Sequence, residues 1–241
     1  MHVHHSKNQK SDLAIQKIEQ GLYSSKFNHA GMDMENVQKS IDAVMNDLKL
    51  IEERREKLIK GTRDVIMLCS KSIVSLHNGK HDIASQQVSK AKELLDELRH
   101  TAQTDLYRYI LTAEAELVEA NALQAVISGT SIPSVQSLSV NGNSYILGLL
   151  DCVGEIKRLV YDKMRNGKSD DAKNLFALME QIYIMLFPFA VYDNIVQGVR
   201  RKLDVARILI EDTRAAVTED SRRLKMLDAI DRLYDRLSKG V

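Results

Sequence analysis

Two pairs of acidic residues lie within otherwise apolar stretches of the chain. Glu116 and Glu119 interrupt a segment rich in Ala and Leu, and Asp151 and Glu155 interrupt a second apolar segment. Both segments are predicted to be helices, and residues three or four apart share a helix face, so each pair points one way. A buried acid is costly unless it is protonated, paired or bound to a metal. The four acids therefore predict a divalent-metal site.

The chemistry of this site follows from its ligands. An α-helix turns by about 100° per residue, so the first pair is about 60° apart and the second about 40°. The four side chains converge if the two helices pack side by side. Carboxylate oxygens suit Mg²⁺, Mn²⁺ and Ca²⁺, and such sites are typical of phosphodiester cleavage, where the metal activates water and neutralises the phosphate. Glu114 is about 160° from Glu116 and is expected to face solvent.

A plainer interpretation of the acids stays open. Carboxylates are common on helices, and each could be solvated or paired with a basic neighbour such as Lys157 or Arg158. No histidine accompanies them, so the histidine-containing di-iron pattern of helical bundles is absent. His77 is expected in a turn or at the surface. The basic run Arg200–Lys202 is expected to be a solvated helix face rather than a phosphate site.

Composition favours an all-α chain. The 241 residues include 44% apolar residues, only two prolines and no tryptophan. The chain carries 34 basic and 33 acidic residues, so no global basicity indicates nucleic-acid binding, and any such contact must be local. Cys69 and Cys152 are far apart, which disfavours a disulfide and suits a reducing cytoplasm. The N-terminus lacks a secretory signal, and no membrane partner is expected because no run of about 18 apolar residues is found.

The pattern of apolar residues predicts a single-domain antiparallel bundle of about seven helices. Residues 1–32 are polar and are predicted to be a disordered tail, which leaves residues 33–241 as the helical domain. The longest loop is expected at residues 130–143. The expected helices cover about 34–77, 83–102, 104–129, 144–166, 169–187, 190–217 and 219–238.

The first expected helix carries coiled-coil spacing. Its apolar stripe follows alternating steps of four and three residues. Arg55, Thr62 and Ser72 interrupt that stripe, which suggests local solvent exposure or a subunit contact. The apolar members of the stripe are Val37, Ile41, Val44, Leu48, Ile51, Leu58, Val65, Cys69 and Leu76.

Three segments carry a resemblance to a known family. They are Arg55-Glu-Lys-Leu-Ile-Lys-Gly-Thr-Arg-Asp64, Glu116-Leu-Val-Glu-Ala120 and Tyr145-Ile-Leu-Gly-Leu-Leu-Asp-Cys-Val-Gly-Glu155. In these segments, in their order and in their separation, the chain resembles the translin family. Within that family it is most similar to translin-associated factor X, as an archaeal-type homologue. The resemblance covers roughly residues 52–215.

The resemblance implies an activity. Glu116, Glu119 and Asp151 match the catalytic acids of translin-associated factor X, and Glu155 matches a glutamate found in both branches of the family. Together they would hold Mg²⁺, with Mn²⁺ as a substitute. The implied protein is a cytoplasmic endoribonuclease that acts on single-stranded RNA inside a hollow homo-oligomer of about eight translin-like subunits.

Nucleic-acid contacts are expected from Tyr107-Arg108-Tyr109, which resembles a segment lining the translin cavity. On one continuous helix, Arg108 would lie about 20° around and about 16 Å along from Glu119. It could then hold a phosphate while a tyrosine stacks on a base. The alternative is an exposed arginine between two core tyrosines.

Two other functions stay open. The first is a non-catalytic binding protein of translin type for single-stranded RNA or DNA, with sequence-specific DNA binding as one form of it. The second is a structural helical adaptor, which would leave the four acids unexplained. The acids favour the nuclease, because carboxylates beside a phosphate backbone weaken binding unless a metal intervenes.

Overall fold

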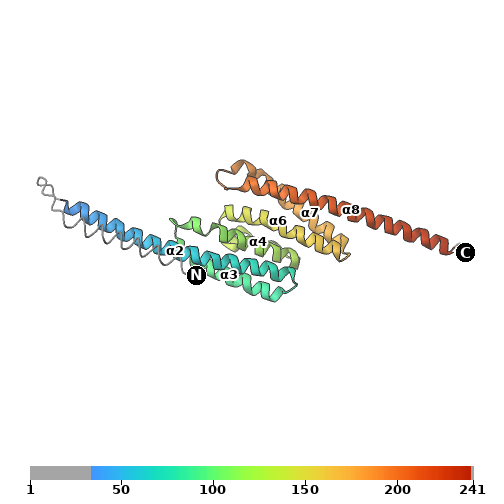
Figure 1. Cartoon of the computed structure of the whole chain (residues 1–241), viewed down its shortest axis with the longest axis horizontal. Helices are drawn as coiled ribbons and strands as arrows, with labels where there is room; N and C mark the ends of the chain where they lie inside the picture. The colour runs from blue at the N-terminus through green and yellow to red at the C-terminus, as the bar shows by residue number, and fades with distance from the viewer. Residues whose placement is uncertain (1–33, 240–241) are drawn as a thin grey trace, which may run out of the picture. The chain divides into compact units, whose positions relative to one another are not determined.

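The protein is helical throughout the part that the computed structural model describes, residues 34–239 (Figure 1). No strand occurs among these residues, so the predicted all-α fold class is confirmed. The predicted tail, residues 1–32, lies outside the described part. The elements are α2 (Glu35–His77), α3 (His81–Ala102), η1 (Tyr107–Tyr109), α4 (Leu111–Ser128), α5 (Val135–Leu138), α6 (Gly142–Arg165), α7 (Ser169–Leu186), η2 (Phe187–Tyr192) and α8 (Val199–Lys239).

The chain divides between Lys49 and Leu50 into two compact units. The described residues of the first unit, 34–49, form the start of α2, and all of them are exposed. The coiled-coil stripe is therefore continuous in sequence, but its two parts differ in exposure. Its members from Leu58 onward are buried in the core of the second unit, whereas those before Lys49 remain on the surface.

Two polar interruptions of that stripe are buried, which corrects the expectation of solvent exposure. The Thr62 hydroxyl donates to the Leu58 carbonyl oxygen at 2.8 Å, and the Ser72 hydroxyl donates to the Ala84 carbonyl oxygen at 3.0 Å. Each hydroxyl finds a backbone acceptor, so neither burial leaves an unsatisfied polar group. Ser72 in addition ties α2 to α3.

Helices α4 and α6 pack together at the centre of the second unit, and α6 also packs on α7 and α8 (Figure 1). Gly148 on α6 lies directly against α4. A Cβ atom there would lie 2.3 Å from the Ala115 carbonyl oxygen and 2.7 Å from the Val118 Cβ. Only glycine allows this spacing, which brings the acids of α4 and α6 onto facing surfaces.

Three predicted boundaries differ from the structure. The helix expected at 104–129 is interrupted, because Gln103 has a left-handed φ of 51° and η1 follows before α4 begins at Leu111. The break expected near residue 218 is absent: α8 runs unbroken to Lys239, and the segment around that position contains neither Gly nor Pro to end a helix. The start of α8 is set instead by Gly198, with φ of 83°.

One described segment has the length and composition of a membrane span. Within Ser169–Tyr192, an 18-residue window is apolar enough to cross a membrane by length and composition alone, and 17% of that window is buried. Glu180 and Gln181 interrupt it, so it is not the uninterrupted apolar run that the sequence analysis looked for. Its Ala172, Met179 and Ile182 belong to the protein core. One side of this segment therefore packs in the protein core, and its other side is apolar and exposed.

Candidate metal and nucleic-acid site

The four predicted acids come together between α4 and α6. Glu116 and Glu119 on α4, and Asp151 and Glu155 on α6, are all half-buried. Burial raises the pKa of Glu119 to about 8, with further contributions from the charges of Asp151, Glu116 and Glu155. Burial also raises the pKa of Glu116, and Asp151 adds to that increase. The charges of these acids therefore act on one another, and we call the four residues the acidic cluster.

Two basic side chains, Lys202 and His77, pair with acids of this cluster, and neither pairing was predicted from the sequence. Lys202 of α8 contacts both carboxylate oxygens of Asp151. His77 Nε2 lies 2.5 Å from Glu155 Oε2, and its side chain is only 3% exposed, so the expected surface position of His77 is wrong. The hydrogen bond from His77 lowers the pKa of Glu155.

The sequence offered no signal for either pairing. Lys202 lies 51 residues from its partner and His77 lies 78 residues from its own, so only the tertiary fold brings them in. The neighbour that the sequence suggested as an ion-pair partner, Lys157, instead pairs with Asp212 at 3.2 Å. The expectation that Arg200–Lys202 is simply a solvated face is likewise wrong at Lys202.

The acidic cluster fits a hard divalent cation by its chemistry, although it is not preorganised around one. Within residues 34–239, no three His, Cys, Asp or Glu side chains are already arranged to hold a metal ion. Glu116 and Glu119 make no ion pair in this part of the chain. A carboxyl group whose pKa is raised to about 8 lacks compensating positive charge. Carboxylate donors with a deficit of positive charge suit Mg²⁺ or Mn²⁺.

The two cysteines lie near these acids but are poor ligands. Both are free and buried, which agrees with the predicted absence of a disulfide. Burial raises the pKa of Cys69 to about 12, and Glu116 and Glu119 add to the shift. Burial also raises the pKa of Cys152. Because a thiolate is the form that binds metals, both thiols are inert at neutral pH.

A cavity of about 390 Å³ opens beside the acidic cluster. Asp151 lines it together with Gly198, Arg201 and Lys202. One carboxylate and two basic side chains therefore line the cavity, together with the apolar Leu150, Val205 and Leu209. A phosphate group placed there would meet two cations next to the acids.

The predicted nucleic-acid residues divide into two environments. The Tyr107 hydroxyl donates to Glu114 Oε1 at 2.7 Å and so belongs to the interior. Arg108 is exposed, and its Nη2 donates to the Tyr109 hydroxyl at 3.3 Å. Arg55 of α2 donates to the same hydroxyl at 3.0 Å. We call Arg55, Arg108 and Tyr109 the arginine–tyrosine cluster.

This arginine–tyrosine cluster has the chemistry of a phosphate and base contact. The guanidinium carbons of Arg55 and Arg108 lie 5.7 and 5.1 Å from the Tyr109 ring centroid. Hydrogen bonds from Arg108 and Arg55 lower the pKa of Tyr109. Since Arg108 lies in η1 rather than on α4, the predicted helical register between Arg108 and Glu119 is wrong.

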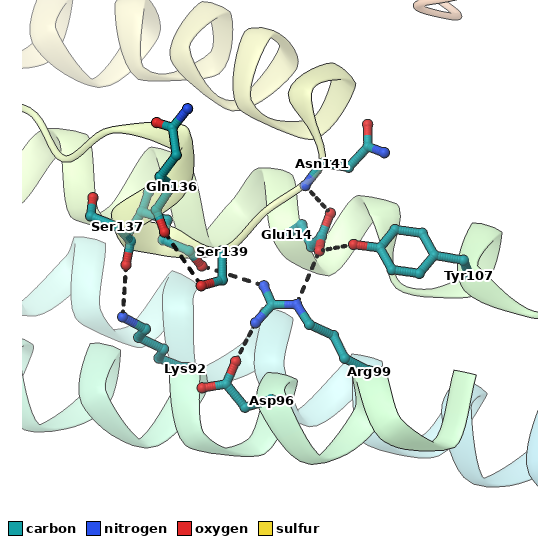
Figure 2. A network of polar contacts seen from close by, with 10 residues as sticks. Lys92, Asp96, Arg99, Tyr107, Glu114, Gln136, Ser137, Ser139 and Asn141 are labelled. Atoms are coloured by element: carbon teal, nitrogen blue, oxygen red, sulfur yellow. Dashed lines mark hydrogen bonds and ion pairs between the residues drawn. The ribbon is translucent and has the colours of Figure 1, made fainter. Parts of the chain in front are cut away.

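Glu114 holds the start of α6 against α4 (Figure 2). Its side chain is fully buried, which corrects the expectation that it faces solvent. Besides Tyr107, it accepts from Arg99 Nε at 3.2 Å and from the backbone N–H of Asn141 at 2.9 Å. Asn141 in turn caps α6, because its side-chain oxygen accepts from the Asn143 N–H at 2.8 Å. The network fixes the register in which α6 presents its acids.

Solved structures resemble this chain. The crystal structure of AfC3PO is 32% identical, with 76% of this chain and 98% of that chain covered and a TM-score of 0.71. The structure of an AfC3PO complex with duplex RNA is 31% identical, with 76% and 97% covered and a TM-score of 0.70. The crystal structure of apo-NeC3PO, at 22% identity and a TM-score of 0.67 over 79% and 100%, shares the fold.

Sequence comparison agrees with the structural comparison. An uncharacterized protein of Methanocaldococcus jannaschii is 28% identical over 202 residues, which are 83% of this chain and 90% of that protein. Residues 53–212 match the Translin family, and this range contains the acidic cluster, its partners Lys202 and His77, and the arginine–tyrosine cluster. The chain belongs to the Translin family.

Proposed function

We propose that the protein is a Mg²⁺-dependent endoribonuclease that binds single-stranded RNA. The observation that carries the proposal is the convergence of four carboxylates, with the pKa of Glu119 raised to about 8 by burial and by its acidic neighbours. Pure RNA binding gives no reason to gather acids beside a phosphate backbone. The duplex RNA in the AfC3PO complex supports RNA as the class of ligand.

Glu116, Glu119 and Asp151 would hold the metal, with Glu155 as a fourth ligand. Bound there, Mg²⁺ or Mn²⁺ would supply Lewis-acid activation of water and neutralise charge on the phosphate. The residues of the chain do the rest. His77 fixes the orientation of the Glu155 carboxylate. Arg108 and Tyr109, which lie just before α4 begins, would bind a phosphate and stack on a base.

The setting of this reaction is part of the proposal. We propose a homo-oligomer of about eight subunits, as the family resemblance implies, in the cytoplasm. Large exposed apolar side chains support assembly: Ile184 is 68% exposed and Val191 is 73% exposed. Single-stranded DNA is a second candidate ligand, and the exposed arginine–tyrosine cluster would accept either backbone.

Cleavage of a labelled single-stranded RNA tests the proposal. We expect wild type to cleave with Mg²⁺ and not with EDTA, and Glu116→Gln/Glu119→Gln to bind the RNA without cleaving it. Glu211→Gln, an exposed acid on α8, is the matched control and should cleave as wild type does. A duplex of the same sequence shows whether the strand must be single.

The outcome also separates the alternatives. RNA that is bound but left intact under Mg²⁺ and Mn²⁺ would replace the nuclease with the translin-type binding protein. Arg108→Gln should weaken RNA binding and reduce the salt slope by about 1, as loss of one phosphate contact predicts. An unchanged affinity and slope in this variant would remove the arginine–tyrosine cluster from the interface.

A further inference from the structure

Lys202 is the only lysine or arginine that pairs with the acidic cluster in the described part of the chain, residues 34–239. Its ammonium group contacts both oxygens of Asp151. It also acts on both glutamates of α4, since it opposes the effect of burial on the pKa of Glu116 and Glu119. One ammonium group therefore serves three carboxylates.

The contact with Asp151 occupies the oxygens that a metal would need. An ammonium group donates hydrogen bonds to the same lone pairs through which a carboxylate coordinates a cation. Lys202 and a divalent ion therefore compete for Asp151. A divalent ion carries twice the charge of the ammonium group, so it would neutralise more of the acidic cluster than Lys202 does.

The cavity beside Asp151 can accept the Lys202 ammonium group once it leaves the carboxylate. Lys202 is about one-third exposed and has a flexible stem, and it lines the 390 Å³ cavity beside Asp151. Arg201 lines the same cavity and makes no ion pair within residues 34–239. Once Lys202 leaves Asp151, two cations face one cavity next to the acids.

We propose that Lys202 is an exchangeable counter-ion: it holds Asp151 before the metal binds, and then turns with Arg201 toward an RNA phosphate. This inference rests on the proposed metal site and goes beyond it, because it makes metal and RNA binding cooperative. Lys202 is a positioning residue in this scheme. Its ion pair with Asp151 explains how the folded protein tolerates four neighbouring carboxylates without a metal.

Mn²⁺ titration of the full-length protein without RNA, followed by calorimetry, tests the exchange. Lys202→Met should bind Mn²⁺ more tightly than wild type, on the order of tenfold, because the competitor is gone. Lys202→Arg should bind it more weakly, since a guanidinium grips a carboxylate with two parallel hydrogen bonds. Lys157→Met, which removes a lysine from another ion pair between α6 and α8, that with Asp212, should match wild type.

The RNA arm tests the second half of the exchange. Mn²⁺ should tighten binding of a non-cleavable RNA to wild type and to Lys157→Met, but have much less effect on Lys202→Met. Equal Mn²⁺ affinity in wild type, Lys202→Met and Lys202→Arg would overturn the inference, and so would failure of all three to bind Mn²⁺. The expected pattern of Mn²⁺ affinity without any RNA cleavage would remove the proposed nuclease and leave the exchange standing.

Discussion

At the scale of single residues, the acidic cluster is defined by unequal partners. Asp151 and Glu155 form ion pairs with Lys202 and His77, whereas Glu116 and Glu119 form no ion pair within residues 34–239 and feel Lys202 only at a distance. The ionised forms of the two glutamates of α4 are therefore the most destabilised in the cluster. Such imbalance is common where a protein keeps charge ready for a ligand.

This imbalance predicts a pH dependence of stability in metal-free protein. Folded Glu119 keeps its proton up to pH of about 8, whereas the unfolded chain loses it near the ordinary value of 4.5. The folded state thus binds more protons, and its stability is full below that ordinary pKa and falls as pH rises toward 8. Thermal unfolding in EDTA should show this fall in wild type and a flatter profile in Glu119→Gln.

The control for this measurement is Glu211→Gln, which alters an exposed carboxyl group and should keep the wild-type slope. Added Mg²⁺ should reverse the trend, because it binds the ionised carboxylates and its affinity rises with pH. Parallel profiles for wild type and Glu119→Gln would contradict the raised pKa.

At the scale of elements, the close contact of α4 and α6 positions the acids. Gly148→Ala should force the helices apart, because its Cβ would lie 2.3 Å from the Ala115 carbonyl oxygen. Overpacking of this kind costs about 1–3 kcal/mol. We expect weaker Mn²⁺ binding as well as lower stability, since Asp151 moves with α6.

Gly154→Ala on the same helix is the matched control. Its Cβ would meet Leu209 Cδ1 at 3.7 Å, an ordinary contact. Replacing glycine within a helix should raise stability by roughly 0.5–1 kcal/mol. Equal Mn²⁺ affinity in the two variants would show that the spacing of α4 and α6 does not set the geometry of the acids.

Glu114 links the same elements by hydrogen bonds. Glu114→Ala leaves Arg99, Tyr107 and the Asn141 N–H without their buried acceptor, and loss of one partner of a buried pair costs about 3–5 kcal/mol. Tyr107→Phe removes a single hydrogen bond and should cost about 1 kcal/mol. Denaturant unfolding measures both, and equal losses would refute the central place of Glu114.

The sequence predicted elements better than partners. The expected helices at 144–166 and 169–187 match α6 and α7 closely, because Asn166-Gly167 and Pro188 mark their ends. Helix periodicity placed the acids of each pair on one face, but their convergence depended on α4 and α6 packing side by side, which the structure shows. Glu114 was wrongly expected to face solvent. Helix periodicity gives the direction of a side chain around the helix axis, but it does not show which neighbouring segments cover that side of the helix. Lys202 and His77 were missed because their partners are distant in sequence.

At the scale of the whole molecule, apolar side chains remain uncovered on α7 and η2. We call this surface the α7–η2 apolar surface; it lies on the same segment that has the composition of a membrane span. Core residues of α7 face the bundle, so the exposed residues need another partner, and surfaces of this kind mark interaction sites. Its members are Ile184, Met185, Phe187 and Val191.

A second copy of the chain is the partner that the proposed assembly provides. Ile184→Asp/Val191→Asp should therefore lower the molar mass measured by light scattering, because a buried unpaired carboxylate opposes association. Both positions are more than two-thirds exposed, so the subunit itself should keep its helicity. Ile83→Asp, at a 47% exposed position on α3, is the control and should leave the mass unchanged. A wild-type mass in the double variant would move the subunit contact elsewhere, with the exposed coiled-coil stripe at the start of α2 as the next surface to alter.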